Sequence, residues 1–310
     1  MLNDDPPPAR NSSDQRLDAS SRAQKPTTDK PSRSFFTIPP PVKRIFDKFP
    51  LVTYAENELP SRAPKERGKH VLHIFTSEED ARKGRPSFNP ACVKWQAYMK
   101  FNGIDVSVVP SSNHASPSGA LPFLLPAVAA SAKDPVPSNK LRKWVLSQKG
   151  AEKAQESEDI RYEAYASLLD TRIRKAWLFQ LYLNPANNAL LQRLYIAPCS
   201  SNPFVRMTIA YQLRQAAETE LVKSSASDRL VEDDIMRDAE GAFEALATLL
   251  GEDEWFFGQE QPGLFDASVF AYTHLLLDDG MPWQENKLAE MARRHGSLVR
   301  HQERIAMLYF

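Results

Sequence analysis

Residues 116–126 read Ser-Pro-Ser-Gly-Ala-Leu-Pro-Phe-Leu-Leu-Pro. We interpret the rest of the chain around this stretch, because it decides the predicted fold. A turn at Ser118-Gly119 leads into Leu121-Pro122 and then into an apolar run. Proline has no N–H to donate to a neighbouring strand, so it is tolerated at the first residue of a strand or at a sheet edge. We therefore expect a strand that starts at this proline. The sequence leaves open whether the Leu121-Pro122 bond is cis.

The segments around this stretch supply the rest of a small sheet domain. Residues 70–76 and 104–109 are rich in β-branched and aromatic side chains and predict two strands. Between them, residues 88–101 show helical spacing of large side chains, and a further helix is expected over 139–148. A strand–helix–strand unit followed by a proline-led strand is typical of a thioredoxin-like domain.

The remaining residues predict helices. Residues 204–222 and 235–250 carry helical patterns. An aromatic run, Trp255-Phe-Phe-Gly258, then precedes an apolar helix that has Asp266 in its first turn, a combination that indicates a buried helix start. Gly263 occupies the cap position, so only one half of a reciprocal capping box is present. The predicted fold class is therefore mixed: a thioredoxin-like α/β domain followed by an all-helical domain.

Composition limits the class of protein. The 310 residues include 39 basic and 39 acidic side chains and 42% hydrophobic residues, enough for a large core. Balanced charge argues against an electrostatic nucleic-acid binder. Two cysteines are too few for a disulfide framework, and no apolar run reaches the roughly 18–20 residues that span a bilayer. We expect a soluble or peripheral protein from a reducing compartment.

The predicted organisation has four parts. Residues 1–34 are polar, Pro-rich and poor in large apolar side chains, so they predict a disordered tail. Residues 35–69 contain an apolar arm and a polar linker, residues 70–150 the thioredoxin-like domain, and residues 151–310 the helical domain.

The arm at residues 35–54 is the candidate binding segment. Its apolar side chains fall on one face of a short helix, and basic side chains lie off that face. Such a segment can cover the core of its own chain, or it can dock on another protein or on an anionic membrane surface. The candidate partner-binding residues are Val42, Lys43, Arg44, Ile45, Phe46, Phe49 and Tyr54.

The sequence gives little evidence for a catalytic or metal-binding site. Residues 77–87, after the first strand, predict a charged, mobile loop. Thr76 or Ser77 could act as a nucleophile, but no base is assigned to either. Cys92, near a helix start, is better explained as a small buried side chain, and Ser138 as a helix N-cap. The histidines show no metal-ligand spacing. The sequence predicts no catalytic, cofactor-binding or metal-binding residue.

Three segments together resemble the metaxin family of glutathione transferase-like proteins: residues 116–122, 255–258 and 264–272. Residues 41–51 with Thr53-Tyr54 resemble the opening of the smaller, fungal metaxin-like peripheral subunit of the mitochondrial sorting and assembly machinery (the SAM complex).

The resemblance implies a non-enzymatic component at the cytosolic face of the mitochondrial outer membrane. Its implied partners are a BamA-type barrel subunit, a larger metaxin-like subunit, and the β-signal of β-barrel precursors. An extended signal needs either backbone pairing or an apolar groove, and the sequence does not choose between them. The implied alternative is a glutathione-dependent transferase or reductase that uses Cys92, Ser77 or Thr76. The other alternative, the larger metaxin-like subunit, fits less well, because residues 41–51 match the smaller one.

Overall fold

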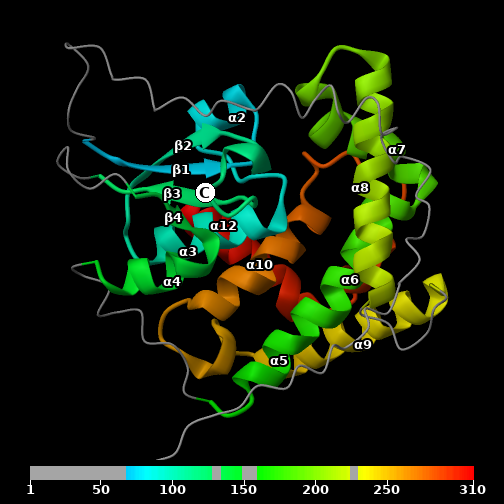
Figure 1. Cartoon of the computed structure of the whole chain (residues 1–310). Coiled ribbons are helices and arrows are strands. Elements are labelled where there is room, and N and C mark those ends of the chain that lie inside the picture. The colour runs from blue at the N-terminus through cyan, green and yellow to red at the C-terminus, as the bar shows by residue number, and fades with distance from the viewer. Residues whose placement is uncertain (1–67, 128–133, 149–158, 224–229) are drawn as a thin grey trace, which may run out of the picture. The chain divides into compact units, whose positions relative to one another are not determined.

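The computed structural model describes residues 68–127, 134–148, 159–223 and 230–310. The sheet half contains, in chain order, β1 (His70–Ile74), α2 (Glu78–Lys83), α3 (Pro90–Phe101), β2 (Val106–Pro110), β3 (Phe123–Leu125), β4 (Val136–Pro137) and α4 (Ser138–Leu146) (Figure 1). The helical half contains α5 (Tyr162–Leu168), α6 (Arg174–Leu178), α7 (Asn188–Leu191), α8 (Pro203–Lys223), α9 (Glu232–Leu250), α10 (Leu264–Leu277), α11 (Lys287–Arg293) and α12 (Gly296–Tyr309). Short π-helical segments continue α5, α6 and α7, at Leu169–Ile173, Phe179–Leu183 and Gln192–Ile196.

The described strands form one sheet in the order β2-β1-β3-β4. β1 pairs in parallel with β2 and antiparallel with β3, where His73 lies opposite Phe123. Parallel neighbours need a crossover connection, which α3 provides. Leu72 and Ile74 of the central strand β1 are fully buried. The predicted strand–helix–strand unit and the proline-led strand are confirmed, and the Leu121-Pro122 bond is cis.

Helix α3 links the two halves. Its start is fixed by Asn89, whose side-chain oxygen accepts the Cys92 N–H at 3.3 Å, and by Pro90 in the first turn. Gly103, just after its end, has φ of +65°, a conformation that glycine adopts without steric cost. The helix predicted over 88–101 is therefore confirmed, and α3 packs against α10 of the helical half.

Two local predictions in the sheet half are wrong. The charged segment 77–87 is not only a loop, because it contains α2, with Ser77 as its N-cap. Ser138 is not an N-cap but the first residue of α4; the cap position is Pro137, which has no polar side chain to offer. At α4 the helix begins one residue earlier than predicted, whereas at α2 a whole helical turn stands where a loop was predicted.

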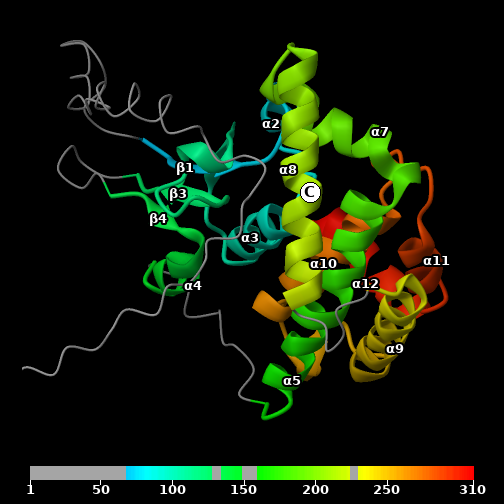
Figure 2. The same cartoon turned by 45° about the vertical axis from the view of Figure 1, so that its right-hand side comes forward.

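The helical half is built around α10, whose residues are buried on almost all sides. Figure 1 shows α10 beside α3, and in Figure 2 α8 stands at the front between the sheet half and α9. The helices predicted over 204–222 and 235–250 correspond to α8 and α9. The mixed fold class is confirmed. Residues 1–67, including the predicted arm, lie outside the described residues, and the four-part division of the chain stays a prediction.

Candidate functional site

Aromatic side chains gather just after the end of β1. Phe75 follows β1, and Phe88 precedes α3. Both rings contact Tyr195 from the helical half, with centroid distances of 5.3 Å and 5.2 Å. Edge-to-face contacts of this kind are favourable beyond the area they bury. The two halves are therefore joined by packing at this point.

Hydrogen bonds fix the same junction. Asn89, which caps α3, also donates from its side-chain nitrogen to the Tyr195 hydroxyl at 3.1 Å. Gln96 accepts the Ser87 N–H at 2.8 Å, and the Ser87 hydroxyl donates to the Phe75 carbonyl. Burial raises the pKa of Tyr195 well above its ordinary value. The Tyr195 hydroxyl is therefore neutral at neutral pH, and its bond with Asn89 joins the two halves.

Cys92 lies in the first turn of α3, a position where a helix N-terminus can activate a thiol. The side chain is fully buried. Burial raises the pKa of the Cys92 thiol to about 12, so the nucleophilic thiolate is not populated at neutral pH. The prediction that Cys92 is a small buried side chain is confirmed.

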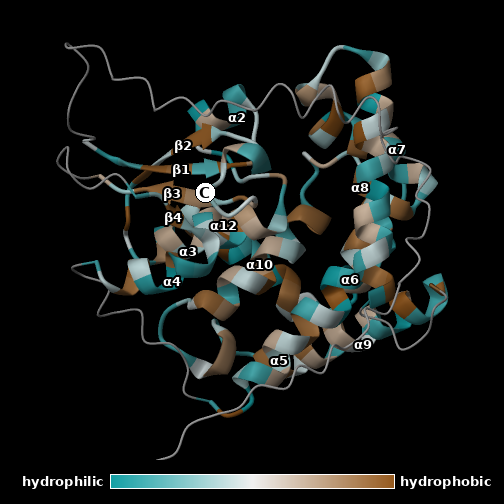
Figure 3. Cartoon of the chain, in the orientation of Figure 1, coloured by the Kyte–Doolittle hydropathy of each residue, from teal (hydrophilic) through white to brown (hydrophobic). Residues whose placement is uncertain are grey.

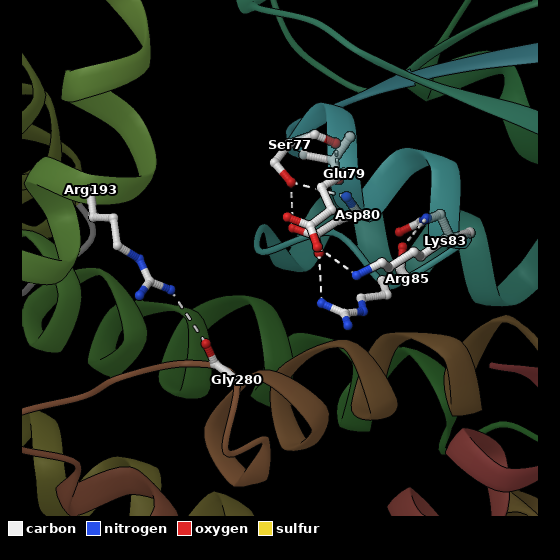
Figure 4. A network of polar contacts seen from close by, with 9 residues as sticks. Ser77, Glu79, Asp80, Lys83, Arg85, Arg193 and Gly280 are labelled. Atoms are coloured by element: carbon white, nitrogen blue, oxygen red, sulfur yellow. Dashed lines mark hydrogen bonds and ion pairs between the residues drawn. The ribbon is translucent and has the colours of Figure 1, made fainter.

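Thr76 is half-buried and Ser77 is exposed, and Ser77 is engaged in the start of α2. Its hydroxyl donates to the Asp80 carboxylate at 2.6 Å and accepts the Asp80 N–H at 3.0 Å. Arg85 holds the same carboxylate at 3.1 Å, as Figure 4 shows. Figure 4 also shows Arg193 of the helical half, which donates to the Gly280 carbonyl in the same half. The geometry suits a capped, charged surface helix.

The backbone N–H of Leu121, the first residue of the cis bond, also has a hydrogen-bond partner. The Leu121 N–H donates to the side-chain oxygen of Asn113 at 3.0 Å. Because His73 pairs with Phe123, Leu121 comes two residues before the first paired residue of β3. The side chain of Asn113 therefore satisfies a backbone donor at the entry to β3.

The start of α10 holds a buried polar site. Asp266 is 1% exposed and accepts the Gly263 N–H at 2.9 Å and the Phe256 N–H at 3.0 Å. His301 of α12, fully buried, places Nε2 at 2.9 Å from the same carboxylate. The predicted half of a capping box is present, and the carboxylate ties three segments together. His274, within α10, is buried and contacts Gln302 at 3.2 Å.

The predicted binding residues Val42, Lys43, Arg44, Ile45, Phe46, Phe49 and Tyr54 lie outside the described residues. The sequence interpretation missed two features. One is the junction at Tyr195, which no local pattern announces because its partner Asn89 is distant in sequence. The other is an apolar face on α8, formed by Phe204, Met207 and Tyr211, whose spacing was visible. Within the four described ranges, no group of histidine, cysteine or acidic side chains could hold a metal ion.

No helix in the described part of the chain is long and apolar enough to cross a membrane.

Three regions of the chain match known protein families. Residues 36–95 match the family described as SAM35, subunit of the SAM complex. Residues 90–187 match the glutathione S-transferase N-terminal domain, and residues 239–305 match the glutathione S-transferase C-terminal domain. Metaxin-3 of Xenopus laevis is 28% identical over 194 residues, which is 61% of this chain. These matches support a metaxin-family, SAM35-like protein.

A second relative of this metaxin-family chain is Metaxin-1 of Macaca fascicularis, 27% identical over 73% of the chain and 72% of that protein. The match to Metaxin-3 spans 62% of the length of that relative. The glutathione S-transferase matches on both halves agree with the observed topology, and the glutathione transferase-like fold is thereby established.

Solved structures give weaker likenesses. The beta-etherase LigF from Sphingobium sp. strain SYK-6 has a TM-score of 0.46 at 12% identity and covers 76% of this chain and 94% of its own. Glutaredoxin 2 from Salmonella typhimurium, in complex with glutathione, has a TM-score of 0.42 at 16% identity and covers 76% and 98%. At these scores the likenesses add nothing to the assignment of function.

Proposed function

We propose that this metaxin-family chain is a non-enzymatic, peripheral subunit of the SAM complex at the cytosolic face of the mitochondrial outer membrane. The observation that carries the proposal is the match of residues 36–95 to the SAM35 family, since this region contains the candidate docking arm and continues into β1 and α3. In this proposal the chain binds the BamA-type barrel subunit, lies beside the larger metaxin-like subunit, and helps to engage the β-signal of β-barrel precursors.

The environment of the former reactive centre supports a non-catalytic role. Cys92 is buried with its pKa raised to about 12, and the Ser77 hydroxyl caps α2. Aromatic side chains and Asn113 occupy the end of β1 and the backbone donor beside the cis bond. A fold that hosts enzymes elsewhere can serve binding alone when its site chemistry has changed.

The docking surface proposed for the barrel subunit is the arm with Ile45, Phe46 and Phe49 on its apolar face and Lys43 and Arg44 beside it. Large apolar side chains and arginine are the residue types that dominate the energy of protein interfaces. Polar and acidic replacements on the apolar face are therefore expected to release the chain from its partners.

The test is the triple variant Ile45→Asp/Phe46→Asp/Phe49→Asp, expressed as the full chain in mitochondria. We expect an unchanged circular dichroism spectrum and at least about tenfold less co-purification with the barrel subunit, because each lost anchor residue costs about 2 kcal/mol or more. The matched control is Ala9→Asp/Ala19→Asp/Ala23→Asp, which adds the same charge to a segment outside the SAM35 match. Full co-purification of the first variant would show that the arm is not the docking site.

Two further measurements test the location. Alkaline washing of mitochondria is expected to extract the chain if it is peripheral, and protease added to intact mitochondria is expected to digest it if it faces the cytosol. Retention after alkaline extraction, or full protection from the protease, would contradict the proposed location.

A further inference from the structure

One segment of this balanced chain carries charge of a single sign. Residues 171–217 include the basic side chains Arg172, Arg174, Lys175, Arg193, Arg206 and Arg214 and contain neither aspartate nor glutamate. Arg172 and Arg174 form ion pairs with Asp238 and Glu220 of other segments. A run of this kind is a local source of positive potential in a chain whose net charge is zero.

The arginines on and beside α8 bind neutral oxygen atoms. Arg206 donates to the carbonyls of Ser200 and Ala197, and Arg214 donates to the side-chain oxygen of Asn188 at 2.7 Å. A neutral acceptor orients a guanidinium group but does not cancel its charge, and arginine stays charged at all ordinary pH values. Both side chains therefore keep a full positive charge in a fixed place.

Large apolar side chains lie exposed on the same part of α8. Phe204, Met207 and Tyr211 are 75%, 64% and 55% exposed. Their spacing of three and four residues places them on one face of the helix. Figure 3 shows apolar ribbon in the N-terminal half of α8, and Figure 2 shows α8 standing at the front of the described residues. Single exposed apolar side chains are ordinary, but a cluster on one helix face indicates a contact site.

The charged and the apolar groups share one concave surface. A groove of about 490 Å³ beside α8 is lined by, among others, Pro203, Arg206, Met207, Ala210, Tyr211 and Arg214. Arg206 and Arg214 are eight residues apart, which is about 12 Å along a helix. We call this groove, together with the neighbouring Phe204, the α8 patch. In the patch, the guanidinium groups of Arg206 and Arg214 lie beside apolar side chains, so one ligand can contact both.

We propose that the α8 patch binds a membrane surface that contains anionic phospholipids. The arginines would take the phosphate groups, while Phe204, Met207 and Tyr211 would lie in the interfacial layer, where aromatic side chains with a polar tip are favoured. Lipid headgroups move freely, so two of them can reach both guanidinium groups without a matched partner surface. This inference rests on the proposed location at a membrane, and it supplies a lipid contact beside the protein contacts of the arm.

The test uses the purified full chain and flotation with vesicles of phosphatidylcholine, with or without phosphatidylserine. We expect partition into the anionic vesicles that weakens as salt is raised. The variant Phe204→Ser/Met207→Ser/Tyr211→Ser is expected to lower this partition at least about tenfold, because three apolar anchors are lost. Arg214→Gln is expected to lower it about fivefold, the effect of one charge near an anionic surface.

The matched control is Met307→Ser/Leu308→Ser on α12, since these side chains are 81% and 58% exposed at another site. It should leave partition unchanged. Equal partition of wild type and the α8 triple variant, or a loss as large in the α12 control, would overturn the proposal. It would also be overturned if the triple variant kept its vesicle binding but lost binding to a synthetic peptide rich in Asp and Phe, because the occupant would then be an acidic protein segment.

The vesicles contain no protein, so their result is independent of the docking test on the arm. Failure here would leave co-purification with the barrel subunit unaffected, and failure of the arm variant would leave the lipid result standing.

Discussion

Helices α10 and α2 begin with similar hydrogen bonds in opposite surroundings. At α10, Asp266 is almost completely buried and accepts the N–H groups of Gly263 and Phe256. At α2, Ser77 accepts the N–H of Asp80 in full contact with solvent, and no residue of α2 is buried. A buried acceptor cannot be replaced by water, whereas an exposed one can.

The difference separates the residues that stabilise this fold from those that form the exposed surface after β1. The start of α10 joins the aromatic run 255–258 to α12 through His301, so the core depends on it. The segment after β1 carries exposed ion pairs such as Lys83–Glu79, which contribute little to stability. A surface of that kind can change without unfolding the protein, and it is a place where binding properties can be built.

The largest effect is expected at Asp266. Replacing Asp266 with Ala leaves the buried Phe256 N–H, the partly buried Gly263 N–H and buried His301 without their acceptor, so we expect the free energy of unfolding to fall by about 3–5 kcal/mol. Denaturant unfolding of the full chain measures it. Asp266→Asn keeps one carbonyl acceptor and should fall between Ala and wild type. A loss below about 1 kcal/mol for Ala would show that the α10 start is no more important than the α2 start.

Cys92 gives a pH-dependent effect of intermediate size. In the folded chain the thiol keeps its proton up to about pH 12, while in the unfolded chain it loses it near pH 8.5. Between these values the unfolded state binds fewer protons, so stability falls as pH rises, by about 1.4 kcal/mol per pH unit from this group. Below about pH 8.5 both states are protonated, and the contribution does not vary.

The measurement compares denaturant unfolding of wild type and Cys92→Ala between about pH 8 and 10. The free energy of unfolding of Cys92→Ala should decline less steeply with rising pH, because the variant lacks this thiol. The buried tyrosines remain in both proteins and contribute equally. Parallel curves for the two proteins would mean that Cys92 ionises as easily in the folded chain as in the unfolded one.

At the junction of the two halves we expect a smaller change. Tyr195→Phe keeps the ring contacts with Phe75 and Phe88 but removes the hydroxyl that accepts from Asn89. The expected loss is about 1 kcal/mol, the usual value of one hydrogen bond with a neutral partner. Thermal or chemical unfolding measures it, and the control is Tyr165→Phe at another aromatic contact, where the ring lies 6.4 Å from that of Phe257. An unchanged free energy of unfolding would mean that ring packing alone stabilises the junction.

The smallest global effect is expected at Ser77. Ser77→Ala removes the N-cap of α2, which costs the helix about 1 kcal/mol locally. Since α2 buries no residue, global unfolding should change by less than about 0.5 kcal/mol. Hydrogen exchange of the Asp80 N–H should become faster, while exchange in α10 stays the same. Faster exchange in α10 as well would show that α2 supports the core.

Local sequence signals were sufficient for most of the fold. Pro90 and Asn102-Gly103 mark the ends of α3, and the apolar pattern around Asp266 marks α10. Helix α2 was missed because it has no apolar period. Its signal was electrostatic instead: acidic residues at 78–80 in the first turn and Arg82 and Lys83 in the last.

The site was less predictable than the fold. Cys92 could be assigned to the core because it shares a helix face with Trp95 and Met99, and its burial confirms this. Tyr195 could not, because its role depends on contacts with Phe75, Phe88 and Asn89 that only the folded chain creates. The exposed face of α8 could not be distinguished from a buried stripe by spacing alone.

In the proposed function, this glutathione transferase-like chain acts through its surfaces and has no thiol chemistry of its own. The most direct measurement is glutathione-dependent turnover by the purified full chain with a general electrophilic substrate, together with calorimetric titration of glutathione. We predict no turnover above the uncatalysed rate and no binding heat. Turnover that is abolished by Cys92→Ala would contradict the claim.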